Sequence, residues 1–394
     1  MQVRTGTHSE MKYPSEVVAA MPRSGIREIY DLAHQIPDAI HLEAGEPSYP
    51  TPEHIRQAAI DAIDEGFTKY TPNAGIPELR RAIADDVMRR SRIAVDPDQV
   101  IVTPGGVAAL FSSLKALTDP GDSVLISDPA WPNYRMMLSV LGLDVQPFPL
   151  AVDDGLVPRP EVIERYISDT TKLLIVNSPS NPTGTVIPAD VLAEIMELAR
   201  RHGLWVISDE VYDQLTFDQE AVPMARFDTD SRVVTVNSFS KTYAMTGWRV
   251  GYAICPPEIA PLLSKVQEPI TSCVNGPAQR AALAALTGPQ EVVAEMRSGY
   301  RGRRDSVMEI LSAGGVEAVR PSGAFYVWVD IRRTGLSDRE FALKLVKDRH
   351  VAVVPGTTFG SEGSTSIRLS LATDSALLTE GVGRLATAVN DWAG

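Results

Sequence analysis

Short apolar runs alternate with longer helical patterns through the middle of the 394-residue chain, and this alternation limits the fold more than any other feature. The runs are rich in β-branched residues and cover 100–102, 124–126, 173–176, 204–207 and 233–236. Helical spacing of apolar residues fills intervening segments such as 107–117 and 189–201. A strand that is apolar along its whole length must be covered on both faces. The sequence therefore predicts an α/β fold with a mostly parallel sheet between two layers of helices.

The pattern changes near residue 290, where a long helical stretch begins, and strands are expected later at 325–330 and 366–371. This order is typical of a second, smaller α+β domain. The first forty or so residues contain no clear strand of the large sheet, so we expect them to pack with the smaller domain. The predicted division is an N-terminal arm at 1–45, a large domain at 46–285 and a small domain at 286–394.

Composition excludes several classes of protein. With 44% hydrophobic and 22% charged residues the chain is an ordinary globular protein, and its net charge of -13 argues against nucleic-acid binding. Two cysteines are too few for a disulfide framework, which favours a reducing compartment. The N-terminus has no signal-peptide pattern, and no run of about 18 apolar residues predicts a membrane span. We expect a cytoplasmic protein that binds neither membrane nor nucleic acid.

Polar residues follow three of the predicted strands. Asn181, Asp209 and Lys241 each lie just past the end of a different apolar run. Ligands bind parallel sheets beyond the carboxyl ends of the strands, so these three side chains are candidates for one site. The six histidines have no metal-ligand spacing, so no metal is expected. A Rossmann-type dehydrogenase is disfavoured because the only GxGxxA match, 381–386, follows no predicted strand.

Lys241 lies in the segment SFSKTYAMTGWRVGY (238–252), between the apolar run 233–236 and a second predicted strand at 248–254. An amine must be neutral to attack a carbonyl, and burial lowers the pKa of a lysine from its usual value of about 10.4. Ser238, Ser240 and Arg249 suit a phosphate group.

The segment 105–109 opens a helix directly after a strand, and its bare N–H groups would complete a phosphate cup. A lysine beside a phosphate cup indicates a phosphorylated aldehyde held as a Schiff base, which is pyridoxal phosphate. Asp209 fits the same interpretation, because a carboxylate aimed at the pyridine nitrogen keeps it protonated. Each residue alone has an ordinary explanation, a surface charge for Lys241, a turn for Asn181 or a helix cap for Asp209. Their combination in this order favours the shared site.

Six motifs span nearly the whole chain. They are GEPSYPTP (45–52), YTPNAGIPELR (70–80), NSPSNPTG (177–184), SDEVY (208–212), SFSKTYAMTGWRVGY (238–252) and SIRLS (366–370). In their order and spacing the chain resembles the fold-type-I pyridoxal-phosphate aminotransferases of class I/II, the aspartate aminotransferase superfamily. The resemblance implies a large domain with a seven-stranded sheet, a smaller α+β domain and a homodimer with shared active sites.

The resemblance also implies roles for individual residues. Lys241, Asp209 and Tyr212 are the implied catalytic residues, with Lys241 carrying the cofactor and serving as the base. The implied cofactor-binding set is Gly105, Gly106, Val107, Trp131, Asn181, Asp209, Tyr212, Ser238, Ser240, Lys241, Arg249 and, from the neighbouring subunit, Tyr70. The implied substrate-binding set is Gly45, Trp131, Asn181 and Arg368, with Arg368 taking the α-carboxylate.

The expected activity is transfer of an amino group from an L-amino acid to a 2-oxo acid by a ping-pong mechanism. Three alternatives remain open: another reaction on the same scaffold (a β-lyase, an elimination like that of aminocyclopropane-carboxylate synthase, or an oxidase), a regulatory module that binds the cofactor without turnover, and aspartate aminotransferase specificity.

The side chain of the amino donor is predicted from two positions. Family members that prefer aspartate can place a lysine just after the glycines of the phosphate turn, where this chain has Val107. Ile26 is expected to line the same pocket. A carboxylate buried against these apolar residues would lose hydration without compensation, so we predict a neutral donor, aliphatic or aromatic. Arg23, Arg27 or an arginine from a partner subunit could reverse this preference by reaching an acidic side chain.

Overall fold

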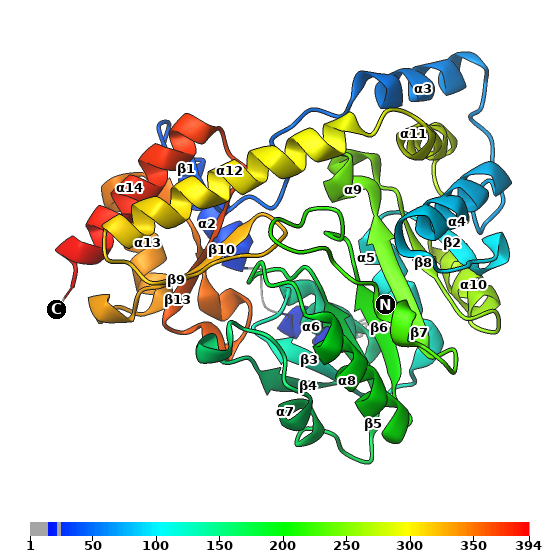
Figure 1. The fold of residues 1–394 in the computed structure, drawn as a ribbon, viewed down its shortest axis with the longest axis horizontal. Helices are drawn as coiled ribbons and strands as arrows, with labels where there is room; N and C mark the ends of the chain where they lie inside the picture. Colours follow the sequence, from blue (N-terminus) through cyan, green and yellow to red (C-terminus); the bar gives the residue numbers. More distant parts are fainter. Residues whose placement is uncertain (1–14, 22–24, 394) are drawn as a thin grey trace, which may run out of the picture.

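A seven-stranded sheet lies at the centre of the larger part of the protein, in a computed structural model that describes residues 15–21 and 25–393 (Figure 1). In spatial order its strands are β2 (Val100–Thr103), β8 (Gly251–Ile254), β7 (Val233–Ser238), β6 (Trp205–Asp209), β5 (Thr171–Asn177), β3 (Ser123–Asp128) and β4 (Asp144–Pro149). Only β8 runs against its neighbours, since its pairings with β2 and β7 are antiparallel and those between the other strands are parallel. The predicted mostly parallel sheet is confirmed.

Helices cover both faces of this sheet, as continuous apolar strands require. They are α3 (Glu53–Asp64), α4 (Pro77–Ser91), α5 (Gly106–Leu117), α6 (Pro132–Leu141), α7 (Pro160–Glu164), α8 (Ala189–Arg201), α9 (Phe239–Thr242), α10 (Ala260–Thr271) and α11 (Gly276–Thr287). The neighbours Val206 and Ile207 in β6 are both fully buried but belong to different apolar clusters, Val206 with residues of α8 and Ile207 with residues of α5. Alternate residues of one strand therefore pack against opposite helical layers.

Two strands differ from the prediction. The strand expected at 248–254 begins only at Gly251, because Thr246–Trp248 forms a 3₁₀ turn and Arg249 takes a left-handed conformation with φ 54°. A Cβ on Gly251 would lie 2.6 Å from the backbone of Gly105, so only glycine allows this close approach. Strand β4 was not predicted, because its sequence DVQPFP has two prolines and little apolar pattern. As the edge strand it tolerates them.

The remaining strands form a four-stranded antiparallel sheet and a separate parallel pair. The sheet has the order β12 (Val354–Pro355), β13 (Ser366–Ser370), β10 (Tyr326–Asp330) and β9 (Ala318–Val319), and the pair joins β1 (Ile40–His41) to β11 (Val351–Ala352). The helices of this part are α2 (Gly25–Ala33), α12 (Glu291–Ala313), α13 (Asp338–Arg349) and α14 (Ser375–Asp391), whereas α1 (Glu16–Ala20) contacts α6 of the larger part.

From α2 onward, the N-terminal segment packs with these C-terminal elements, through the pairing of β1 with β11 and the contacts of α2 with α13. The domain boundaries at 45 and 285 remain a prediction. Helix α12 extends from the neighbourhood of α9 and α11 to α14 (Figure 1). No helix among residues 15–21 and 25–393 is both long and apolar enough to span a membrane.

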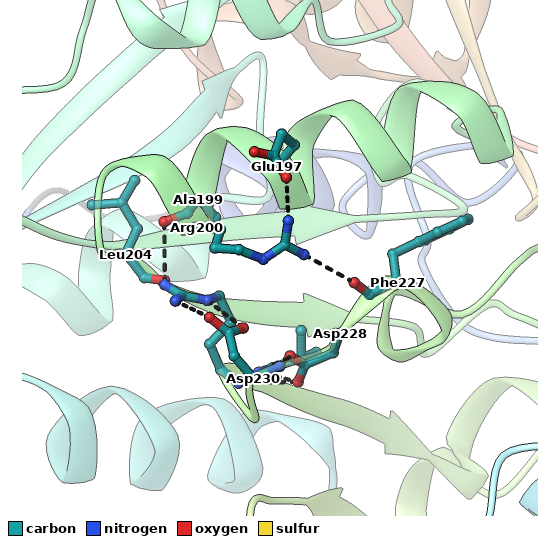
Figure 2. Close-up of polar contacts among 9 residues, drawn as sticks. Glu197, Ala199, Arg200, Leu204, Phe227, Asp228 and Asp230 are labelled. Carbon is teal, nitrogen blue, oxygen red and sulfur yellow. Dashed lines mark hydrogen bonds and ion pairs between the residues drawn. The ribbon is translucent and has the colours of Figure 1, made fainter.

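The entry to β7 is fixed by the hydrogen bonds drawn in part in Figure 2. The carboxylate of Asp228 accepts hydrogen bonds from the backbone N–H groups of Arg232 and Val233, both at 3.0 Å. The guanidinium of Arg232 donates to the carbonyl oxygens of Ala199 and Leu204, at 3.2 and 2.9 Å. These bonds tie the start of β7 to the end of α8. The opposite end of β7 leads directly into the segment that carries Lys241.

Replacement of Asp228 by alanine should lower the free energy of unfolding by about 1–3 kcal/mol, because the backbone N–H groups of Asp230, Arg232 and Val233 lose their acceptor. The midpoint of urea unfolding measures the change. Asp230→Ala is the control: this carboxylate pairs with Arg232 at the surface, where such pairs contribute about 1 kcal/mol or less. Equal effects of the two substitutions would contradict the role of Asp228.

Candidate active site

A cavity of about 240 Å³ lies at the carboxyl edge of the large sheet. Twelve of the fourteen predicted site residues line it, and they come from segments spread over the whole chain: Gly45, Gly106, Val107, Trp131, Asn181, Asp209, Tyr212, Ser238, Ser240, Lys241, Arg249 and Arg368. Asp209 and Ser238 are the last residues of β6 and β7. The sheet therefore brings strand-end side chains together, as the sequence predicted for Asn181, Asp209 and Lys241.

Two predicted residues do not line the cavity. Gly105 lies just behind it, with φ 84°, and a Cβ there would be 2.6 Å from Nη2 of Arg249. Tyr70 is 90% exposed. Its predicted contact is with a second subunit, so the single chain does not test it.

The amine of Lys241 reaches into the cavity and donates a hydrogen bond to the carbonyl oxygen of Gly45 at 2.6 Å. Burial lowers the pKa of Lys241 to about 8, with Glu46 opposing the shift and the positive charges of Arg368 and Arg249 adding to it. A lysine with this pKa is partly neutral near pH 7–8 and can act as a nucleophile or a base.

Asp209 lies at the bottom of the cavity and is 2% exposed. Its Oδ2 accepts a hydrogen bond from the hydroxyl of Tyr134 at 2.5 Å, and Oδ1 accepts a longer one from the backbone N–H of Val211 at 3.4 Å. Burial raises the pKa of Asp209 to about 6, and the two hydrogen bonds oppose that shift. Sequence reasoning missed Tyr134, although its position three residues after Trp131, at the start of α6, was a usable signal.

One wall of the cavity has the character of an anion site. The twelve-residue helix α5 begins there at Gly106, and the hydroxyls of Ser238 and Ser240 lie 2.9 Å apart beside it. The guanidinium of Arg249 also faces this wall, held by a 2.8 Å bond from its Nη1 to the carbonyl oxygen of Thr246. Backbone N–H groups at a helix start, hydroxyls and a guanidinium together suit a phosphate. The residues present therefore fit the phosphate of pyridoxal phosphate.

Arg368, in β13, is only 1% exposed. Its Nη1 donates to Oδ1 of Asn181 at 3.1 Å, and its Nη2 donates to the carbonyl oxygen of Glu43 at 2.6 Å. The guanidinium carbon lies 4.3 Å from the ring centre of Tyr326 and 5.0 Å from that of Phe359. A guanidinium has five N–H donors, so three remain, and the buried Nε has no partner among the described residues. This arrangement can bind a carboxylate.

Several lining residues were not predicted: Leu110, Tyr134, Asn177, Val211, Thr246 and Tyr326. The hydroxyl of Tyr326 lies 2.9 Å from that of Tyr212. It also packs against Gly45, where a Cβ would come within 2.8 Å of it, so this contact requires the glycine. In the sequence Tyr326 is one of several apolar residues in a strand, and only the strand pairing reveals its position. Within the described residues no group of three His, Cys, Asp or Glu side chains is arranged to hold a metal ion.

The chain is similar to known proteins in family, in sequence and in structure. The family model of aminotransferase class I and II matches residues 37–385. Aspartate/prephenate aminotransferase of Thermus thermophilus is 41% identical over 376 residues and covers 95% of each chain. Aspartate aminotransferase of Pyrococcus horikoshii is 35% identical over 379 residues, which are 95% of this chain and 97% of that protein.

Solved structures agree with the sequence comparison. Aspartate aminotransferase from Thermus thermophilus with maleate superposes with a TM-score of 0.92 at 40% identity, covering 96% of this chain and all of the other. Aromatic aminotransferase from Pyrococcus horikoshii gives a TM-score of 0.88 at 37% identity, over 92% of this chain and 99% of the other. The fold is therefore that of the fold-type-I pyridoxal-phosphate enzymes.

These similarities cover nearly the full length of the chain and include both its sheets. The cofactor of this family is pyridoxal phosphate, and its reaction transfers an amino group to a 2-oxo acid. The chain belongs to the aminotransferases of class I and II and is a pyridoxal-phosphate-dependent transaminase.

Proposed function

We propose that the enzyme takes a neutral amino acid as donor and that Lys241, Asp209 and Arg368 carry the reaction. One observation supports this most strongly: a partly neutral amine, a buried carboxylate and a buried guanidinium face one cavity. A nucleophilic amine, a proton-holding carboxylate and a carboxylate-binding cation are the groups that amino transfer requires.

The cavity residues divide into those that hold the cofactor and those that orient it. Pyridoxal phosphate, when bound, supplies an aldehyde carbon and a ring that accepts electrons. The residues predicted to bind its phosphate are Gly105, Gly106, Val107, Ser238, Ser240, Arg249 and Tyr70 of a second subunit. Asp209 would hold a proton at the pyridine nitrogen, and Tyr212 and Asn181 would bind the ring oxygen. Trp131 packs on the ring face.

Arg368 binds the α-carboxylate of the donor, beside Gly45 and Asn181. This contact would orient Cα toward Lys241, whose neutral amine would take up the Cα proton and give it back. The donor would leave as its 2-oxo acid, with water supplying the oxo oxygen and the amino group remaining with the cofactor. A second oxo acid then reverses the sequence, which gives ping-pong kinetics.

The neutral donor is supported by the apolar part of the cavity lining. Ile26, Val107 and Leu110 all line it. Of the two arginines of this chain that could have reached an acidic side chain, Arg27 has a side chain 75% exposed and lies 3.8 Å from Asp31, while Arg23 lies outside the described residues. The related structures include both an aspartate and an aromatic aminotransferase, so the family accommodates either class of donor.

A homodimer with shared sites is supported by two exposed features, Tyr70 and an apolar groove. In the groove Ile60 and Ile63 are 49% and 56% exposed. Both isoleucines line an open groove that also includes Arg249 of the phosphate wall. A second subunit that buries this groove could bring its own Tyr70 to the phosphate. A cytoplasmic location is supported by the free cysteines Cys255 and Cys273.

The half-reaction tests the assignment of Lys241. Holoenzyme given an amino donor without an acceptor should change its visible absorbance and release one equivalent of oxo acid. Lys241→Ala should slow this step at least about a thousandfold, because the base is lost. Lys344→Ala, which removes a surface lysine stacked on Trp392, should leave the rate unchanged. A Lys241→Ala enzyme that turns over at the normal rate would refute the proposal.

Donor preference is tested by kcat/KM for alanine, valine, phenylalanine, glutamate and aspartate with one fixed oxo acid. We expect the neutral donors to lead, because an acidic side chain would be buried against Val107 and Ile26 without a cation. Val107→Lys should shift the preference toward aspartate by about tenfold or more. If aspartate leads in the unmodified enzyme by tenfold, about 1.4 kcal/mol of transition-state stabilisation, the apolar pocket does not set the specificity.

Tyr70→Phe should weaken cofactor retention about tenfold, since one hydrogen bond to a charged phosphate is lost. Loss of cofactor on dialysis measures this change. Tyr166→Phe, at a surface tyrosine 40% exposed, is the matched control. A catalytically active monomer in analytical ultracentrifugation would rule out the shared site.

A further inference from the structure

A buried carboxylate lies behind the cavity and belongs to none of the groups described so far. The side chain of Glu43 is 1% exposed, and the residue does not line the cavity. Its Oε1 lies 2.7 Å from Nδ1 of His41. Its Oε2 is buried and has no hydrogen-bond partner among the described residues. Burial of a carboxylate oxygen without a hydrogen-bond partner costs folding free energy, so a nearby positive charge is expected to compensate for it.

That positive charge is the neighbouring Arg368. The carbonyl oxygen of Glu43 itself accepts the 2.6 Å hydrogen bond from Nη2 of Arg368, so covalent geometry keeps the carboxylate within about 10 Å of the guanidinium. No carboxylate within the described residues lies within 4.0 Å of Arg368, so its charge has no direct ion-pair partner there. Burial lowers the pKa of Arg368, and the neighbouring Tyr326, Tyr212 and Glu43 oppose that shift.

We propose that Glu43 is a positioning residue that acts through Arg368 and limits how tightly the enzyme holds the carboxylates of its substrates and products. This inference rests on the proposed role of Arg368 in binding the α-carboxylate. Arg368 lines the cavity in which the ligand would bind, whereas Glu43 does not line it. The negative charge therefore partly cancels, at the ligand position, the attraction that Arg368 exerts.

The same charge has opposite effects on the empty and the occupied site. Without ligand, the carboxylate offsets the cost of a buried guanidinium and so stabilises the fold. With ligand, it repels the incoming carboxylate and weakens binding. A transaminase must release a carboxylate product in each half-reaction, and binding substrate and transition state equally tightly does not accelerate the chemistry. Weaker binding therefore favours turnover.

His41 holds Glu43 in this position. It lies in β1, which pairs with β11, and its carbonyl oxygen accepts a hydrogen bond from the hydroxyl of Thr373 at 2.7 Å. The His41 side chain is 35% exposed, so the pair connects the buried carboxylate to the surface. The backbone of this segment is fixed at both ends, by the β1 pairing and by the bond from Arg368.

Glu43→Gln tests the proposal, because it removes the charge and keeps the shape. Titration of 4-methylpentanoate, which is leucine without its amino group, into the holoenzyme by calorimetry gives the Kd. We expect the Kd to fall at least about threefold and the KM of the donor to fall similarly, with kcat unchanged or lower. The unliganded variant should melt at a lower temperature than the unmodified enzyme. A merely structural role of Glu43 would lower stability and raise the Kd.

Two controls isolate the charge. Glu43→Asp keeps the carboxylate and should keep the Kd within about twofold of the unmodified enzyme. Asp38→Asn removes an exposed charge of the same segment, whose carboxylate pairs with His350, and should leave the Kd unchanged. If Glu43→Gln does not fold, Glu43→Thr provides a smaller neutral residue for the same measurement.

A Kd that is unchanged or higher in the neutral variants, or equally lowered by Glu43→Asp, overturns the inference. Arg368→Lys distinguishes this failure from failure of the proposed function. If that variant binds 4-methylpentanoate as tightly as the unmodified enzyme, Arg368 is not the carboxylate site and both proposals are wrong. If it loses at least about tenfold in affinity while the neutral variants at Glu43 do not gain, only the role of Glu43 is wrong.

Discussion

Burial of charge at one edge of a sheet is the constraint on which the rest of this structure depends. Asp209, Lys241 and Arg368 all face one small cavity, where Asp209 and Arg368 are almost fully buried and Lys241 is half-buried. Each must therefore find its hydrogen bonds within the protein. The hydroxyl of Tyr134 donates a hydrogen bond to Asp209, and the carbonyl oxygen of Gly45 accepts one from Lys241. The cavity can exist only because the elements that supply these partners are held around it.

The partners of the two cations come from a segment far from either of them in the chain. Lys241 donates to the carbonyl oxygen of Gly45, and Arg368 donates to that of Glu43. Two residues of one short segment therefore accept hydrogen bonds from a cation in α9, which follows β7, and from a cation in β13. Strand β1, just before this segment, pairs with β11. The segment thus links the seven-stranded sheet to the C-terminal elements through buried, charge-assisted hydrogen bonds. Such bonds are stronger than those between neutral groups.

The sequence predicted the features that repeat along the chain or break a pattern. Lys241 and Asp209 were found because charged residues usually lie on the protein surface, whereas these two follow apolar runs that predict buried strands. Tyr134 and Tyr326 were missed because a tyrosine in an apolar pattern is indistinguishable from core, and its function depends on which residue its hydroxyl meets. Tertiary packing decides that, as with the 2.5 Å contact to Asp209. The antiparallel sheet register, in which Trp328 faces Arg368, was equally beyond local patterns.

The cavity also shows how one environment can produce two different protonation states. Burial lowers the pKa of both Lys241 and Arg368. The ordinary pKa of a lysine is about 10.4, and that of an arginine is much higher. The same desolvation therefore lowers the pKa of Lys241 to about 8 but leaves Arg368 a cation. Lys241 as the base and Arg368 as the carboxylate-binding residue can therefore lie in the same cavity. The difference lies in the residue type, and this explains why neither cation could replace the other: a lysine at position 368 could be deprotonated by the burial that activates Lys241, and an arginine at position 241 could not become neutral.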